Sequence, residues 1–376
     1  MGMIQTERLV QTFCRMVSFD SPSYGEREIC DFLTEHLTAL GLRVQEDDAA
    51  QRIHGTAGNL YAYLPATQGM EQLPPLLFSG HMDTVEPSKG KKAIVHADGT
   101  ITSDGSTVLG ADDCAALAAI LEALTVIQEN HLPHRAIEIL FSAAEETYCI
   151  GASVFDFSKI RAKEAYVLDL TGAVGGAAVQ APTLLSFRIA VQGKASPAGF
   201  HPEQGIHAIC VAASAARRLQ NGWLDENTTR NIGTIHGGTQ TNIVPERCVV
   251  TGEIRSFDHE QAMRTWEETK RVFEEEARSL GADVEAEHTV HIHAYKTPEQ
   301  HPVVQRFQRV CAKHGIPSNL CSTMGGSDNN PLSEHGLTGI VLATAMNNCH
   351  SCSEYSHVDE LKKIAAITVD LMCSEE

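Results

Sequence analysis

A histidine and an aspartate stand together where a predicted strand ends, in a pattern that suits a metal site. The apolar run that reaches residue 78 leads through Ser-Gly to His81 and, two residues later, to Asp83. Imidazole is a good zinc ligand, and a ligating histidine usually donates its other ring N–H to a carboxylate. A polar pair in a solvent-exposed turn is the simpler explanation of this motif taken alone.

Two acid pairs occur farther along the chain. Asp112 and Asp113 stand directly before a long apolar helical stretch, and Glu145 and Glu146 follow a β-like run over residues 137–141. Like charges beside a buried strand cost energy unless a cation or solvent offsets them. A metal ion would offset them well. The alternatives are a helix cap for the aspartates, worth about 1 kcal/mol, and a solvated helix start for the glutamates.

Two later residues complete the set of candidates. Asp169 ends the apolar run 166–168, and His350 stands in a late segment, Asn-Cys-His-Ser-Cys-Ser-Glu-Tyr. Taken alone, Asp169 could be an acid on the surface, and His350 could be a histidine of the core whose ring nitrogens are hydrogen-bonded. Cys349 and Cys352 around His350 favour neither a thiolate zinc site nor a redox pair, because a second matched cysteine pair is missing.

The segments that carry these residues have an α/β texture. Apolar residues recur at helical spacing over residues 26–40, and short apolar runs at 76–78, 137–141 and 166–168 alternate with helical stretches such as 113–128. In an open α/β sheet, ligands bind in the crevice at the carboxyl ends of the strands. The sequence therefore predicts that these polar residues converge at one edge of a sheet.

The texture changes in the middle of the chain. From about residue 184, alternating strand-like runs and helices over 205–219 and 261–280 indicate a compact α+β insert. Beyond residue 297 the α/β texture returns. We therefore predict one domain made of residues 1–183 and 297–376, interrupted by a smaller domain, residues 184–296.

Composition narrows the class of partner. The chain of 376 residues is too long for a single hydrophobic core, which predicts two domains. Its formal net charge of −19 makes nucleic acid and anionic membranes poor partners, since binding to either needs a basic face. Eleven cysteines without regular spacing favour a reducing compartment over a disulfide framework. No export signal or long apolar segment is evident, so we expect a cytoplasmic protein without a membrane anchor.

The order of these motifs resembles that of the di-zinc exopeptidase family that includes peptidase T and carboxypeptidase G. His-x-Asp, Asp-Asp, Glu-Glu, Asp and a distant His followed by Glu-Tyr occur in that order. Segments at residues 110–113, 234–245, 252–256 and 325–328 also look like peptidase T-like segments. The resemblance extends over nearly the whole chain.

This resemblance implies both an architecture and a metal site. The expected fold is α/β: a zinc-peptidase-like catalytic domain with a mixed sheet flanked by helices, plus an inserted ferredoxin-like α+β domain for dimerisation and closure. Two divalent ions are implied, zinc first, with cobalt or manganese as alternatives. Asp112 would bridge them, with His81 and Asp169 on one ion and Glu146 and His350 on the other.

The resemblance also assigns the catalytic roles. Asp83 would orient His81, and Glu145 would be the general base that takes a proton from an activated water and passes it to the leaving amine. The peptide bond between Asp112 and Asp113 would be cis.

Substrate contacts carried over from the family are Asn242, Arg255 and the backbone near Gly326. A guanidinium suits a peptide carboxylate because it donates two parallel hydrogen bonds. An ordinary ion pair at the end of a strand is the alternative for Arg255.

Two positions depart from the family pattern. Members usually have lysine or arginine after the Asp-Asp pair, where this chain has Cys114. Pro197 occupies the place of a histidine that, in the family, reaches the partner subunit's active site, and proline can neither donate nor titrate. His201, four residues on, is the candidate substitute. Losing one oxyanion donor costs on the order of a hundredfold to a thousandfold in rate.

The function predicted from the sequence is metal-dependent hydrolysis of an amide bond in a short peptide, as in a tripeptide aminopeptidase. An N-acyl amino acid deacylase or a carboxypeptidase would use the same metal site. A catalytically silent peptide-binding protein with a retained metal site is the alternative from another class, motivated by Pro197 and Cys114. We expect a homodimer that binds a short peptide or acyl amino acid, with no nucleic acid or membrane partner.

Overall fold

The computed structural model describes residues 3–375, in which the chain divides into two compact units. Unit 1 contains the residues up to Gln180 together with those from Lys296 onward, and unit 2 is Ala181–Tyr295. The domain boundaries predicted from sequence, after residues 183 and 296, stand within a few residues of these divisions.

Unit 1 is built on a nine-stranded mixed sheet with the order β1-β2-β6-β3-β7-β18-β8-β16, in which β17 pairs with β8. The strands β3, β6, β7 and β18 run parallel, whereas β1, β2 and β8 join them in antiparallel pairs. Their bounds are β1 Arg43–Glu46, β2 Leu60–Leu64, β3 Leu76–His81, β6 Ile137–Ser142, β7 Glu164–Leu170, β8 Gly176–Ala181, β16 Tyr295–Lys296, β17 Asn319–Ser322 and β18 Thr338–Ala343.

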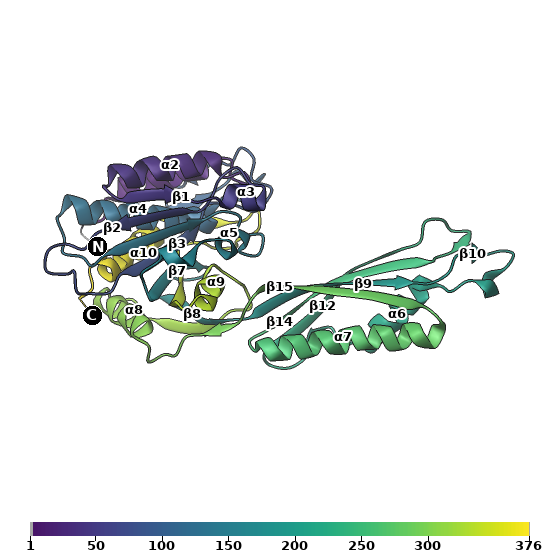
Figure 1. Ribbon diagram of the computed structural model, residues 1–376. Helices are drawn as coiled ribbons and strands as arrows, with labels where there is room; N and C mark the ends of the chain where they lie inside the picture. Colours follow the sequence, from purple (N-terminus) through teal and green to yellow (C-terminus); the bar gives the residue numbers. More distant parts are fainter. Residues whose placement is uncertain (1–2, 376) are drawn as a thin grey trace. The chain divides into compact units, whose positions relative to one another are not determined.

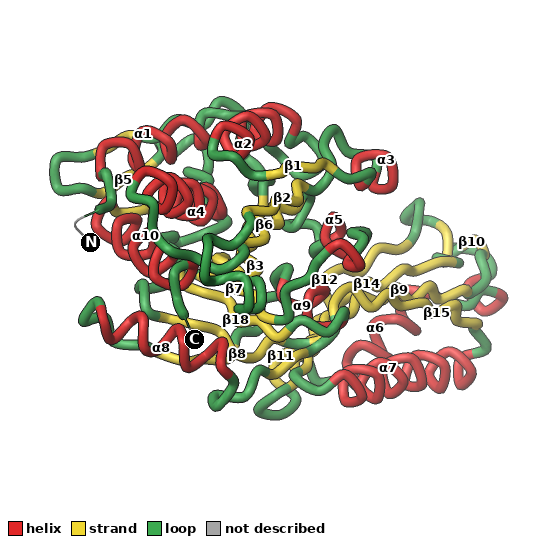
Figure 2. The backbone as a smooth tube through the Cα atoms, turned by 60° about the vertical axis from the view of Figure 1, so that its left-hand side comes forward, coloured by secondary structure: helices red, strands yellow, loops and turns green. Residues whose placement is uncertain are grey.

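Helices cover both faces of this sheet, with α4 and α10 on one side and α5 and α9 on the other (Figure 2). Every residue of β3 and β6 is buried, as expected for parallel strands between two helical layers. The predicted mixed sheet flanked by helices is therefore confirmed. The helices are α1 Thr6–Val17, α2 Arg27–Ala39, α3 Ala49–Ile53, α4 Ala111–Glu129, α5 Ile150–Ser153, α8 Pro302–Lys313, α9 Asn329–Glu334 and α10 Val358–Met372.

Helix α4 is the central helix of unit 1. It is buried along almost its whole length and packs against α1, α10, β3 and β7. A helix that is apolar all round belongs inside a protein, and the alanine-rich sequence of α4 allows the close approach of its neighbours. Its first turn, which carries Asp112 and Asp113, is thereby fixed beside the end of β3. A small sheet of β19 (Tyr355–His357), β5 (Thr100–Thr102) and β4 (Ile94–Val95) completes unit 1.

Unit 2 is a five-stranded antiparallel sheet with the order β11-β12-β14-β9-β15, on which α6 and α7 pack. Figure 1 shows α7 running alongside the long strands. The core of the unit is formed by Phe187, Trp266 and Phe273 and the apolar residues around them. The bounds are β9 Thr183–Gln192, β10 Ser196–Pro197, α6 Ala208–Arg218, β11 Gly222–Trp223, β12 Thr228–Gly237, β13 Ile243–Val244, β14 Arg247–Ser256, α7 His259–Leu280 and β15 Asp283–Ile292.

The start of α6 differs from the sequence prediction. The alanine-rich pattern predicted a helix from residue 205, but α6 begins at Ala208. Lys194 and Ile206 exchange two backbone hydrogen bonds, which keep residue 206 extended. The His207 side chain then accepts the N–H of Cys210 and caps the helix. None of the helices in residues 3–375 has the length and apolarity needed to cross a membrane.

Candidate metal centre

The candidate ligands lie at one edge of the sheet of unit 1. His81 is the last residue of β3, Asp169 lies at the end of β7, and Glu146 follows β6 by four residues. These three strands are parallel, so their carboxyl ends lie at the same edge. Asp112 stands in the first turn of α4, and His350 lies in the loop after β18.

The structure brings these five side chains together in two groups that share Asp112. In the first group, His81 Nε2 lies 3.0 Å from Asp112 Oδ1 and 3.9 Å from Asp169 Oδ1. In the second, His350 Nε2 lies 3.3 Å from Asp112 Oδ2 and 3.0 Å from Glu146 Oε2. Within each group the ligand atoms all lie within 4.8 Å of one another. The two oxygens of Asp112 thus face two different sites.

The charges in this cluster need compensation. Burial opposes the charged form of the His81 imidazole, but contacts with Asp112 and Asp83 outweigh that effect and raise its pKa well above its usual value. Hydrogen bonds that His350 donates to the carboxylates of Asp112 and Glu146 raise the pKa of His350 to about 11. Burial next to other carboxylates raises the pKa of Asp169 well above its usual range. Several acids at this distance favour a bound cation, because they cannot all stay charged without one.

The donor set fits divalent metal ions. Imidazole nitrogens and carboxylate oxygens are the ligands that zinc takes from proteins, and a shared carboxylate is suited to joining two ions. Glu146 Oε1 is buried without a hydrogen-bond partner among the described residues, while its other oxygen contacts His350. A buried carboxylate oxygen needs a partner, and a cation held by Glu146 and His350 would supply one.

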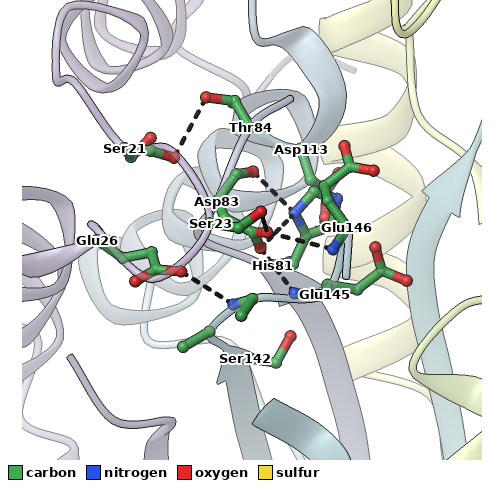
Figure 3. A network of polar contacts seen from close by, with 12 residues as sticks. Ser21, Ser23, Glu26, His81, Asp83, Thr84, Asp113, Ser142, Glu145 and Glu146 are labelled. Carbon is green, nitrogen blue, oxygen red and sulfur yellow. Dashed lines mark hydrogen bonds and ion pairs between the residues drawn. The ribbon is translucent and has the colours of Figure 1, made fainter. Parts of the chain in front are cut away.

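The loop from Ala143 to Glu146, which follows β6, is held by side chains from distant parts of the chain (Figure 3). Its four consecutive backbone N–H groups are all accepted by side-chain oxygens: Ala143 by Asn59 at 3.1 Å, Ala144 by Glu26 at 3.0 Å, and Glu145 and Glu146 by the two oxygens of Asp83 at 2.9 and 3.2 Å. These bonds fix the positions of Glu145 and Glu146 before any ligand arrives.

Asp83 contacts His81 through its backbone carbonyl as well as through its carboxylate. His81 Nδ1 lies 2.9 Å from the backbone carbonyl of Asp83 and 3.4 Å from its carboxylate. The carboxylate also accepts the N–H groups of Glu145 and Glu146 and the hydroxyl of Ser23. The carbonyl is therefore the nearer of the two partners of the ring, and the carboxylate holds the loop from Ala143 to Glu146.

The first turn of α4 is fixed by a carboxylate near the end of the chain. Glu354 accepts the backbone N–H of Gly110 at 2.7 Å and that of Asp112 at 2.9 Å. Burial raises the pKa of Glu354 to about 7. The peptide bond between Asp112 and Asp113 is cis, as the family resemblance implied. Asp113 Oδ2 in turn accepts the backbone N–H of His81 at 3.0 Å.

Sequence reasoning missed several residues that support the site. Glu354 was noticed only as part of a motif, and Glu26, Asn59 and Asp328 were not singled out. Lys91 was also missed: its buried ammonium donates to Thr84 Oγ1 at 2.9 Å and to the carbonyl of Phe19 at 3.0 Å, beneath the segment that carries His81. Each of these residues is a polar side chain outside the helices and strands, and in the sequence such a side chain looks the same as one on the surface.

A cavity of about 200 Å³ opens beside the ligand cluster, and it lies within unit 1. Glu145 lines it together with Gly326, one of the predicted substrate contacts. Its apolar wall includes Leu170, Val341 and Met346. A space of this size next to the ligands suits one residue of a small substrate.

The other predicted substrate contacts belong to unit 2, and their roles stay predictions. Asn242 is exposed, and its carbonyl accepts the N–H of Ala198. Arg255 donates from Nε to Glu253 Oε1 at 3.0 Å. An ordinary ion pair of this kind was the alternative to a substrate contact for Arg255. Pro197 lies in β10, and the exposed His201 stands 3.5 Å from Glu203.

Comparison with known families and curated proteins gives matches over almost the whole chain. Residues 77–374 match the model described as Peptidase family M20/M25/M40. The protein called "Uncharacterized protein YqjE" of Bacillus subtilis (strain 168) is 38% identical over 370 residues, covering 98% of this chain and 99% of the relative. Peptidase T of Escherichia fergusonii is 27% identical over 415 residues, covering 96% of this chain and 97% of that protein.

Solved structures match equally far. The aminopeptidase PepT from Bacillus cereus ATCC 10987 is 39% identical, with a TM-score of 0.92 and 99% of both chains covered. A tripeptidase from Staphylococcus aureus subsp. aureus Mu50 is 35% identical, with a TM-score of 0.95, and covers 99% of this chain and 98% of its own.

Proposed function

This chain belongs to the peptidase family M20/M25/M40, and on that premise we propose that it is a tripeptide aminopeptidase working with two divalent metal ions. Family membership makes the protein a metal-dependent hydrolase of the exopeptidase type. The finer assignment is supported by its likeness to an aminopeptidase and a tripeptidase along nearly its full length.

One observation carries the two-metal proposal: Asp112 faces His81 with one carboxylate oxygen and His350 with the other. We assign His81 and Asp169 to one ion, Glu146 and His350 to the second, and Asp112 to both. When bound, such ions would supply Lewis acidity, which would lower the pKa of a water and polarise the scissile carbonyl. We take zinc as the first choice, with cobalt and manganese as alternatives.

Glu145 is the proposed general base. Its carboxyl is buried at the edge of the cavity, and burial together with the charge of Asp169 raises its pKa well above the usual range. A carboxyl with a raised pKa can accept a proton from water and release it to the leaving amine near neutral pH. Its backbone is anchored by Asp83, so the group is in place before the substrate binds.

Gly326, Asn242 and Arg255 are the proposed substrate contacts. Gly326 lines the cavity of unit 1, and a residue without a side chain leaves its backbone open to a peptide. Arg255 would exchange its contact with Glu253 for the carboxylate of the substrate.

The test uses purified protein loaded with zinc and a panel of a free tripeptide, its N-acetylated form, a dipeptide and an N-acyl amino acid. Wild-type protein should release the N-terminal residue of the free tripeptide and leave the acetylated form intact. Glu145→Gln keeps the shape of the side chain and should lower turnover about a hundredfold to ten-thousandfold, with metal content unchanged. Asp83→Asn, also isosteric, serves as a comparison, because it weakens the positioning of the base without removing it.

Two results would overturn this function. Cleavage of the acyl amino acid in preference to the tripeptide would identify a deacylase. Full metal content without Glu145-dependent turnover on any member of the panel would favour a silent peptide-binding protein.

We also propose a cytoplasmic homodimer. All eleven cysteines are free thiols, which suits a reducing compartment. Within residues 3–375, β11 covers only the first part of β12, and the remainder of that edge, with the half-exposed Ile235, has no strand partner. An uncovered strand edge is a surface that another chain can extend. Light scattering coupled to gel filtration would test this: a monomer at micromolar concentration would contradict it.

A further inference from the structure

A buried thiol and a buried carboxyl lie next to Glu145, outside the two ligand groups. Glu145, Cys149 and Asp328 each place one polar atom within 4.8 Å of the others. Cys149 is 2% exposed and Asp328 is 1% exposed, so neither is a surface group that happens to lie nearby. The proposed metal centre uses neither of them.

Cys149 contacts the proposed base directly. Its Sγ lies 3.2 Å from Glu145 Oε1, and its backbone N–H donates to the carbonyl of Glu145 at 2.7 Å. Burial, with the charges of Glu145 and Asp328, raises the pKa of the thiol well above its usual value. The thiol therefore keeps its proton, and it is the donor in this contact in the ionised form of Glu145, the form in which that residue acts as a base and its oxygens can only accept.

Asp328 cannot take the same role. One of its carboxylate oxygens accepts the hydroxyl of Ser142, and the other is buried without a partner among the described residues. A second carboxyl beside Glu145 repels its charged form. Of these two neighbours, the Cys149 thiol is thus the one that attracts the carboxylate of the base.

The backbone around Cys149 sets the position from which its thiol extends. Cys149 has a φ of 56° and stands directly before α5. The start of α5 lies very close to the loop from Ala143 to Glu146, which carries the proposed base. A Cβ at Gly151 would stand 1.9 Å from the carbonyl oxygen of Ala143. Asn59 joins the two segments by donating to the Gly151 carbonyl at 2.9 Å and accepting the Ala143 N–H at 3.1 Å. The thiol and the base are therefore carried on one rigid turn.

We propose that Cys149 is a positioning residue for the general base, in which its S–H donates to Glu145 Oε1 and holds that carboxylate at the edge of the cavity. This inference rests on the proposed role of Glu145. It assigns a function to a thiol that is too deeply buried to act as a nucleophile or to react with solvent.

The experiment compares Cys149→Ala with Cys149→Ser in the zinc-loaded protein. Alanine and serine leave nearly the same gap in packing, but only serine keeps a donor. In tripeptide hydrolysis the alanine variant should lose about fivefold to tenfold in kcat, the effect of one lost hydrogen bond from a weak donor, with KM and metal content unchanged. The serine variant should recover most of that loss. Cys149→Gly, which suits the left-handed backbone, is a second variant without a donor and should match alanine.

Equal kcat values for the alanine and serine variants would overturn the inference, as would a change confined to KM or to metal content. These outcomes leave Glu145-dependent hydrolysis by the wild-type protein intact, so they overturn the role of Cys149 alone. Absence of hydrolysis by the metal-loaded wild-type protein would overturn the proposed function and this inference together.

Discussion

Glu354 accepts the backbone N–H of Asp112 at 2.9 Å, across 242 positions of sequence. Its other carboxylate oxygen accepts the N–H of Gly110 at 2.7 Å. Both oxygens thus hold the turn from which Asp112 reaches toward the two histidines. A group that orients a ligand from behind contributes to metal affinity without touching the metal.

Replacing Glu354 should therefore weaken metal binding. Glu354→Ala removes both acceptors and should lower zinc affinity by about tenfold to a hundredfold. Glu354→Gln keeps one carbonyl acceptor and should lie between the alanine variant and wild type. Zinc affinity would be measured by competition with a chromophoric chelator. Glu35→Ala, at an exposed position of α2, is the control and should bind zinc as wild type does, and equal affinity of Glu354→Ala would contradict the positioning role.

The ligand cluster was predictable from sequence because its members stand at places that local patterns mark. His81 and Asp169 come at the ends of apolar runs, and the carboxyl ends of parallel strands share one edge. Asp112 precedes a helix whose unbroken apolar character marks it as central. Pairs of acids beside buried strands are unfavourable for folding, and such a local conflict is expected at a functional site.

The supporting residues were not predictable in the same way. Glu26 and Glu354 act on backbone amides 118 and 242 positions away, and no periodic pattern records such a partner. The Asp83 carbonyl lies next to His81 Nδ1, and the Asp83 carboxylate accepts the N–H of Glu145. This second contact depends on the course of the loop after β6, which the sequence does not reveal. Asn242 and Arg255 belong to unit 2, so their contact with substrate stays a prediction.

A single methyl group at Gly80 should disturb the centre. A Cβ at this buried position of β3 would stand 2.6 Å from Asp113 Oδ2, the oxygen that accepts the backbone N–H of His81. Gly80→Ala should therefore destabilise the protein by about 1 to 3 kcal/mol and reduce zinc affinity. Denaturant unfolding and zinc titration would measure the two effects. Gly199→Ala is the matched control, because a Cβ there meets nothing within 4 Å. Similar behaviour of the two variants would show that β3 and α4 can separate freely.

Metal binding should release protons near neutral pH. In the metal-free protein, Asp112 and Glu146 raise the pKa of His350 to about 11, so this imidazole is protonated at pH 7. A ligating imidazole must be neutral, and the apparent zinc affinity should therefore rise about tenfold per pH unit for each proton displaced. Calorimetry in two buffers of different ionisation enthalpy would count the protons. His350→Ala should release fewer, and a zinc affinity that is constant between pH 6 and 8 would contradict the assignment of His350.

Glu26 should make the stability of the metal-free protein depend on pH. Burial, and then the charge of Asp83, raises the pKa of this carboxyl to about 7, above the value of 4.5 that it has when exposed. Between these two values the folded protein binds more protons than the unfolded chain, so the free energy of unfolding falls as the pH rises through this window. The penalty is absent below about pH 4.5 and fully present above about pH 7.

Glu26→Gln removes this titration while keeping an oxygen that can accept the N–H groups of Tyr24 and Ala144. The variant should have a stability close to that of wild type at pH 5 and exceed it at pH 8 by on the order of 2 kcal/mol. Urea unfolding of the chelator-treated protein at both pH values would test this, with Glu35→Gln as the exposed control. A difference between variant and wild type that stays constant from pH 5 to pH 8 would mean that Glu26 titrates alike in the folded and unfolded chain. The carboxylate would then be charged already at pH 5 while it accepts the N–H of Ala144, whereas a pKa of about 7 leaves it neutral at that pH.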